Sequence, residues 1–86
     1  MSCHTETQKV KLTEMERAEL ADEIRDRITR NALTYVWLIK RLSDHGLFTD
    51  KFEMSSVLSG VRGGPKADRI LTESVSVLDE YEEGVT

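Results

Sequence analysis

The residues that break regular structure are few in this chain, and they stand between stretches of helical periodicity. Among its 86 residues there are one proline, Pro65, and five glycines. An all-β sandwich or barrel needs many turns, and most such turns carry glycine or proline. The shortage of these residues therefore favours an all-α protein. A chain of this length forms one domain with a modest core.

The first predicted helix begins at a capping box and runs to about Asn31. Thr13 is followed three residues later by Glu16, the pattern in which each side chain bonds the other's backbone amide. Apolar residues then recur at spacings of three and four, namely Met15, Ala18, Ala21, Ile24 and Ile28. This spacing predicts one apolar stripe that faces the core.

Charged residues fill the other sides of this first helix. Glu23 and Arg27 stand four residues apart, as do Asp26 and Arg30, with the acid first in both pairs. That order stabilises a helix, and such pairs usually lie in water. We therefore expect both pairs to form a solvated face.

The second predicted helix, from about Thr34 to His45, is short and largely apolar. Thr34 is a good N-cap, and Gly46 is suited to a left-handed stop. The apolar residues nearly surround the helix, and they are Tyr35, Val36, Trp37, Leu38, Ile39 and Leu42. We therefore expect burial on more than one side. Trp37 is expected in the core or half-buried, and Tyr35, at the first helical position, is expected to be exposed.

The third predicted helix is shorter still and ends at Gly60. Either Thr49 or Asp50 caps it. With Asp50 as the cap, Glu53 falls at the third helical position, which is a variant of the capping box. Its inner face consists of Met54, Val57 and Leu58. Its other side carries mostly Lys51, Ser55, Ser56 and Ser59.

A basic, glycine-rich loop, residues 61–64, separates this helix from the last one. Pro65 suits the first position of a helix, where a missing N–H removes no intrahelical bond. Apolar residues follow at three and four spacing, namely Ile70, Leu71, Val75, Leu78 and Tyr81, and the pattern stops near Gly84. We predict a compact bundle of four to five helices, in one domain of residues 12–84 after a flexible tail of residues 1–11.

The net charge of −4 is unevenly distributed. Residues 1–33 carry six basic and seven acidic side chains, and residues 34–70 carry six basic and four acidic ones. Residues 71–86 carry five acidic side chains and no basic one. The middle is therefore mildly basic and the end is acidic. Repulsion from that end weakens non-specific DNA binding but still allows a basic face to bind.

Several classes of protein are disfavoured by features that the sequence lacks. No apolar run approaches the roughly 20 residues of a membrane-spanning helix, and the first residues contain no apolar segment of a secretory signal. Cys3 is the only cysteine, with only His4 and His45 as histidines, so neither an internal disulfide nor a zinc site is expected. No catalytic or nucleotide-binding motif occurs. We expect a cytoplasmic non-enzyme without cofactor, metal or membrane contact.

The middle of the chain fits a DNA-reading role. A reading helix needs an apolar face toward its domain and short or basic side chains toward the groove. The short side chains here are Ser55, Ser56 and Ser59. The cations around the following loop are Arg62, Lys66 and Arg69. These cations would contact phosphates and position the helix without reading sequence.

Three segments resemble motifs of one family. Residues 34–42, TYVWLIKRL, resemble the "TxxxLAxxL" helix two of Cro/repressor-type (lambda-repressor-like, XRE) helix-turn-helix proteins. Residues 54–60, MSSVLSG, resemble their "LSxILNG" helix three. Residues 61–71, VRGGPKADRIL, are similar to the "xRxGPKAxxIL" continuation in small phage and mobile-element members. The resemblance covers about residues 14–82 and is strongest over residues 33–71.

The resemblance implies a compact helical DNA-binding domain, often dimeric, that acts in transcriptional control. By position, Tyr35 would touch a phosphate, and Lys51 and Phe52 would open the reading helix. Ser56 would lie one turn further along, and Ser59 would contact the DNA backbone. The complete set of predicted DNA-binding residues is Thr34, Tyr35, Lys51, Phe52, Ser55, Ser56, Ser59, Arg62, Lys66 and Arg69.

Two features depart from the family pattern. The connection from Ser43 to Asp50 is several residues longer than the usual tight turn, so a helix-turn-helix with a lengthened turn is expected. Phe52 is apolar where a polar reader is common. It is therefore either part of the core or a contact for a thymine methyl group.

A protein-binding module on the same fold is the alternative function. The acidic stretch from Glu73 to Glu83 could mimic phosphates, as in an antirepressor or an inhibitor of a nucleic-acid-binding protein. A DNA reader is expected to be a homodimer, because one reading helix makes few base contacts. Val75, Leu78 and Tyr81 either extend a dimer interface or belong to the intramolecular core.

Overall fold

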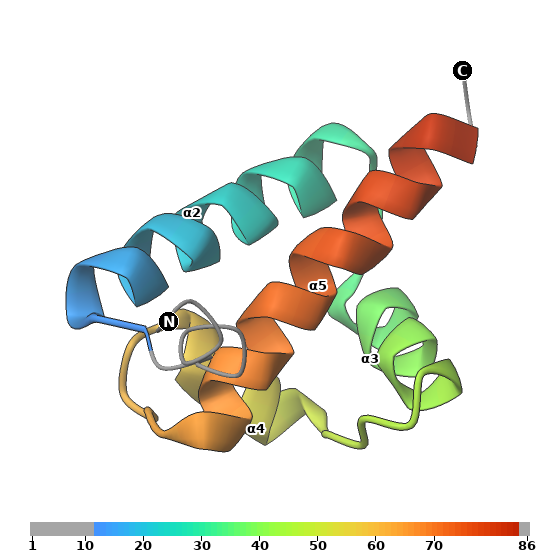
Figure 1. The fold of residues 1–86 in the computed structure, drawn as a ribbon. Coiled ribbons are helices and arrows are strands. Elements are labelled where there is room, and N and C mark those ends of the chain that lie inside the picture. The colour runs from blue at the N-terminus through green and yellow to red at the C-terminus, as the bar shows by residue number, and fades with distance from the viewer. Residues whose placement is uncertain (1–11, 85–86) are drawn as a thin grey trace, which may run out of the picture.

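Four helices form the described part of the chain, residues 12–84 (Figure 1). In this computed structural model they are α2 (Glu14–Arg30), α3 (Tyr35–Asp44), α4 (Lys51–Leu58) and α5 (Pro65–Gly84). The all-α prediction is confirmed, and no strand occurs among these residues. The predicted tail of residues 1–11, with Cys3 and His4, lies outside the described residues.

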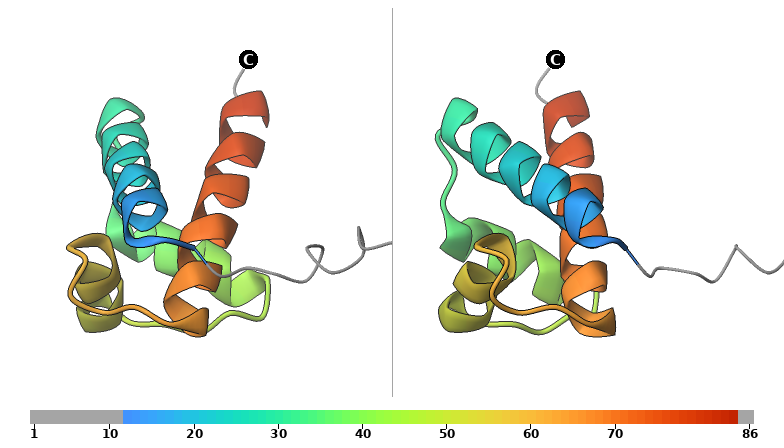
Figure 2. Two further views of the ribbon diagram at one scale, coloured as in Figure 1. Left: turned by 60° about the vertical axis from the view of Figure 1, so that its left-hand side comes forward. Right: turned by 90° about the vertical axis from the view of Figure 1, so that its left-hand side faces the viewer.

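The two long helices, α2 and α5, pack against each other. In both views of Figure 2, the two short helices lie below α2 and beside the N-terminal half of α5. α3 and α4 contact each other and α5, and α4 also contacts α2. All four helices contribute to one core, whose largest fully buried side chains are Ile24, Leu38, Leu42, Met54, Ile70, Leu71 and Leu78. α4 is therefore held by three neighbours and keeps one side free.

Side chains cap the first two helices where the sequence predicts. Thr13 Oγ1 accepts from the amide of Glu16 at 3.1 Å, and Glu16 Oε1 accepts from the amide of Thr13 at 2.9 Å, so the capping box is confirmed. Thr34 Oγ1 accepts from the amide of Trp37 at 3.0 Å. These bonds satisfy amides that the helix itself leaves free, and so they fix where α2 and α3 begin.

The connection between α3 and α4 is longer than a tight turn, as predicted. Gly46 adopts a φ of 83°, which glycine reaches without steric cost. Leu47 is buried in the core and anchors the connection from within. Asp50, not Thr49, is the cap of α4, because its Oδ1 accepts from the amide of Glu53 at 2.8 Å.

The apolar stripe of α2 is only partly as predicted. Ala21, Ile24 and Ile28 are buried, but Ala18 is exposed and Met15 is 71% exposed. Each step of three residues falls about 60° short of a full helical turn, so consecutive steps of three rotate the stripe around the helix. Two such steps back from Ala21 carry Met15 to the side that faces away from the core.

Arg27 is buried, although its spacing from Glu23 predicts a solvated face. Its pair with Glu23 forms at 3.0 Å, but α5 adds two more carboxylates. Arg27 Nη2 lies 2.6 Å from Asp79 Oδ1, and Nε and Nη2 both donate to Glu82 at 3.0 Å. α2 turns this side chain toward α5, where three carboxylates offset the cost of burying the charge. The pair of Asp26 and Arg30 is exposed at 3.4 Å, as predicted.

α3 is less enclosed than its composition suggests. Val36 is 57% exposed, and Trp37 is half-buried, as predicted. Tyr35 is half-buried against the core rather than exposed, since the chain enters α3 beside that core. On α5, Leu78 is fully buried and Val75 packs against the core, so both belong to the intramolecular core. Within residues 12–84, no helix combines the length and apolarity that a membrane crossing requires.

Candidate nucleic-acid interface

The free side of α4 carries short polar side chains and one aromatic ring. Met54, Val57 and Leu58 point into the core, as the sequence predicts. The exposed residues of α4 and its C-cap are Lys51, Phe52, Ser55 and Ser59, and Ser56 is half-buried. Small side chains on this face let another molecule approach the helix backbone closely. Arg25 of α2 fixes the end of this helix, because its Nη1 donates to the carbonyl of Leu58 at 2.6 Å.

Phe52 is a surface residue. Its side chain is 88% exposed, so the interpretation that it belongs to the core is wrong. It stands on the side of α4 opposite the residues that pack inward, and therefore no core position is available to it. Phe48, before the helix, and Val61, after it, are also 67% and 81% exposed. Burying a phenylalanine is worth about 2 kcal/mol, so these side chains favour contact with a partner.

The chain turns sharply after α4 and folds back onto the last turn of that helix. The carbonyl of Ser56 accepts from the amides of Val61 and Arg62 at 3.0 and 3.1 Å. It also accepts from the hydroxyl of Ser59 at 3.2 Å. Gly60 makes the turn with a φ of 86°. This arrangement places Arg62 beside α4 instead of letting it extend away from the domain.

Glu53 of α4 pairs with two cations from the segments that follow this helix. Its Oε1 lies 3.1 Å from Lys66 Nζ, and its Oε2 lies 3.6 Å from Arg62 Nη1. Oε1 also accepts from the hydroxyl of Thr49 at 2.7 Å. The Thr49 hydrogen bond, followed by Lys66 and Arg62, holds the pKa of Glu53 below its ordinary value. From the sequence, Glu53 is expected only as a capping residue, because its cationic partners are distant in the chain.

A shallow pocket of about 430 Å³ opens between the start of α2 and the loop after α4. Its lining consists of Glu14, Arg17, Gly60, Val61, Arg62 and Gly63. Arg17 Nε donates to Oδ1 of buried Asp68 at 2.7 Å, a bond that raises the pKa of the guanidinium and fixes its position. Oδ2 of Asp68 accepts from the amide of Leu12 at 3.1 Å. The sequence does not single out Arg17, which lies beside the loop because α2 packs against α5.

The remaining predicted residues are more scattered. Thr34 is exposed and its Oγ1 caps α3, and Tyr35 is half-buried against the core at the start of that helix. Lys51 is exposed at the first position of α4. Arg69 is exposed one turn beyond the start of α5. The ion pairs and the turn therefore gather Arg62 and Lys66 beside the outward face of α4, and Lys51 begins the same helix.

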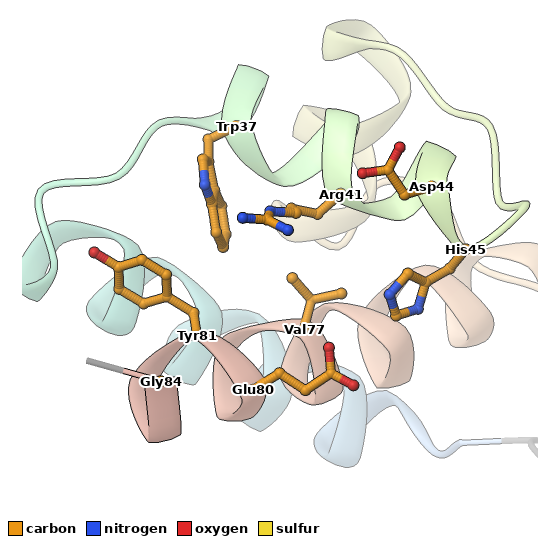
Figure 3. A pocket seen from close by; sticks show the side chains of 8 residues that line it. All are labelled: Trp37, Arg41, Asp44, His45, Val77, Glu80, Tyr81 and Gly84. Carbon is orange, nitrogen blue, oxygen red and sulfur yellow. The ribbon is translucent and has the colours of Figure 1, made fainter. Parts of the chain in front are cut away.

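A second pocket, of about 330 Å³, lies between α3 and the C-terminal half of α5 (Figure 3). The rings of Trp37 and Tyr81 meet edge to face with centroids 5.2 Å apart, and the guanidinium of Arg41 lies 5.3 Å from the Trp37 ring. His45 Nδ1 lies 3.5 Å from Glu73 Oε1 at the α3 end. Tyr81 therefore makes an intramolecular contact.

The acidic surface of α5 is smaller than its sequence suggests. Asp79 and Glu82 bind Arg27, and Glu82 also accepts from the side-chain amide of Asn31 at 2.9 Å. The pKa of Glu82 is lowered by Arg27 first and then by Asn31. Glu73 also has an intramolecular neighbour, since it lies beside His45. This weakens the case for α5 as a mimic of a phosphate backbone.

Comparison of the chain with protein-family models, with curated proteins and with solved structures gives no match.

Proposed function

We propose that this protein is a small sequence-specific regulator that binds double-stranded DNA with the free side of α4 in the major groove. The observation that carries the proposal is the outward face of α4. This face carries small serine side chains beside the exposed Phe52, with Arg62 and Lys66 at its edge. The major groove, about 12 Å wide, admits one helix of this kind. α2, α3 and α5 support α4 from behind, so the helix is presented as a rigid element.

The proposal assigns different tasks to the residues of this face. Lys51, Arg62 and Lys66 contact phosphates and fix the orientation of the helix. Ser55 and Ser59 contact base edges or the backbone through their hydroxyls. Phe52 contacts a thymine methyl group, the only apolar group that a base pair offers in the major groove. A helix of two turns makes few base contacts, so the protein acts as a homodimer on two half-sites.

The biological role that accompanies the family resemblance is transcriptional regulation of the phage or mobile-element type. Selection from random oligonucleotides tests binding and site symmetry together. The expected result is an enriched motif with two similar half-sites about 10 base pairs apart. Phe52→Ala should reduce the preference for a T·A pair at one position of each half-site, by about 1–3 kcal/mol of binding free energy. Failure to enrich any motif at about 50 mM salt would contradict the proposal, because phosphate contacts are strongest at low salt.

A protein partner is the second candidate, and the exposed apolar side chains favour it. Phe48, Phe52 and Val61 together offer apolar area that a protein groove would bury as well as a thymine methyl would. The two candidates separate on salt dependence, since a complex based on apolar contacts changes little between about 50 and 200 mM salt. Co-purification of a protein partner without any DNA binding would favour this second candidate.

A further inference from the structure

Glu53 lies beneath the two cations at the edge of the α4 face. Each carboxylate oxygen faces one cation, Oε1 toward Lys66 Nζ at 3.1 Å and Oε2 toward Arg62 Nη1 at 3.6 Å. The side chain of Glu53 is only 15% exposed, whereas those of Arg62 and Lys66 are 56% and 54% exposed. The cations therefore reach solvent, and the carboxylate stays below them.

The carboxylate of Glu53 is held in place from two directions. The amide of Glu53 donates to Asp50 Oδ1 at 2.8 Å, which fixes its backbone at the start of α4. The hydroxyl of Thr49 donates to Oε1 at 2.7 Å, which fixes the side chain. These two bonds hold the carboxylate beneath the two cations.

We propose that Glu53 is a fixed counter-anion that competes with DNA phosphate for Arg62 and Lys66 and thereby limits the affinity of this face for any duplex. The inference rests on the proposed DNA binding. A phosphate that binds either cation comes close to the Glu53 carboxylate, and like charges repel more strongly where burial reduces screening. Glu53 is thus a positioning residue, which keeps the two cations together in the free protein and weakens their hold on phosphate.

A direct contact between Glu53 and a base does not fit the same geometry. Glutamate can accept a hydrogen bond from the amino group of cytosine, but only if its carboxylate reaches the groove. Here both carboxylate oxygens are engaged by Thr49, Lys66 and Arg62 at the side of the helix. The effect of Glu53 is therefore expected to be the same for every DNA sequence.

The test compares Glu53→Gln with a matched control on a labelled duplex of mixed sequence. Glutamine keeps the size of the side chain and the bond to Thr49 but removes the charge, and we expect about tenfold tighter binding at about 50 mM salt. The gain should be smaller at about 200 mM salt but should persist, because a partly buried carboxylate is screened less than an exposed one. Glu80→Gln makes the same charge change about 20 Å from the start of α5, and binding should stay within about twofold of the unchanged protein.

Two further variants separate an electrostatic effect from a structural one. Glu53→Asp retains the charge and should bind like the unchanged protein. Thr49→Val frees the carboxylate to turn toward solvent and should give part of the gain. Equal or weaker binding by Glu53→Gln, or an equal gain in Glu80→Gln, would overturn the inference and leave the DNA-binding proposal intact. Absence of binding by both the unchanged protein and Glu53→Gln would overturn both.

Discussion

Two clusters of charged residues join the helices of this protein, and they are built in opposite ways. In the first, the cation Arg27 is buried between α2 and α5, and carboxylates surround it. All three of its guanidinium nitrogens are bound, by Glu23, Asp79 and Glu82. Four hydrogen bonds and burial of the side chain thus commit Arg27 to intramolecular partners, and this cluster holds the two long helices together.

In the second cluster, the carboxylate of Glu53 is partly buried, and the cations Arg62 and Lys66 lie over it toward solvent. These cations can exchange their carboxylate for an outside anion, because more than half of each side chain is exposed. The two clusters differ in which member is shielded from water. The first shields its cation, and the second shields its carboxylate and leaves its cations at the surface, where the proposed DNA binding would use them.

Arg27→Ala should give the largest effect on stability. We expect a loss of about 2 kcal/mol in the free energy of unfolding, because the buried contacts and the pairing of three carboxylates disappear together. Unfolding in urea, followed by circular dichroism, measures this loss. Arg30→Ala is the control, since its pair with Asp26 is exposed, and it should stay within about 0.5 kcal/mol. Equal effects of the two variants would remove the distinction between the clusters.

Acid should weaken the protein through the same carboxylates. The pKa values of Glu82 and Glu53 are lowered in the folded protein from an ordinary value of 4.5. The stability that they contribute is therefore present above about pH 4.5 and is lost as the pH falls through the lower folded values. Urea unfolding at a series of pH values between 7 and about 3 measures this. Arg27→Ala should show a shallower decline, and an unchanged decline would contradict the assigned cause.

Ser74 is also a buried polar residue, but unlike Arg27 it is unpaired. Its hydroxyl has no hydrogen-bond partner among the described residues. Its side chain is fully buried on α5. Ser74→Ala removes the unpaired hydroxyl and is expected to stabilise the protein by about 1 kcal/mol. The melting temperature should rise by several degrees, by about 4–8 °C per kcal/mol in a domain of this size. A fall in melting temperature would mean that the hydroxyl is satisfied or that its volume is needed.

Glu53→Gln should have the smallest effect on stability. Its pairs with Arg62 and Lys66 are solvent-facing, and such pairs contribute about 0–1 kcal/mol. Glutamine also retains the bond to Thr49, so the expected loss is about 0.5 kcal/mol in urea unfolding. Glu82→Gln is the matched substitution in the first cluster and should cost more. A large loss for Glu53→Gln would make the second cluster a structural element rather than a place for ligand exchange.

The local features of the fold could be predicted from the sequence because they depend on neighbouring residues. The capping box of Thr13 and Glu16, the turn at Gly46 and the start of α5 at Pro65 are all confirmed. The turn after α2 is not predicted, because no glycine stands there in the sequence. It places Ala32 at a φ of 57°, a conformation that alanine seldom adopts.

The charged clusters could not be predicted, because their partners are distant in the chain. Arg27 looks like one half of a surface pair with Glu23 until α5 brings Asp79 and Glu82 against it. Glu53 is explained locally as a capping residue, although Lys66 binds it from the next helix. Phe52 was ambiguous because periodicity over a two-turn helix does not decide which face packs inward.

Mapping of amide chemical shifts by NMR during addition of a duplex of about 20 base pairs at low salt tests the central claim most directly. If α4 is the binding face, the largest changes will fall on Lys51, Phe52, Ser55, Ser59, Arg62 and Lys66. Amides of the Trp37 and Tyr81 pocket should change little, because that pocket lies between α3 and the C-terminal half of α5. Changes centred on that pocket, or none at all, would contradict the assignment of α4 as a DNA-reading helix.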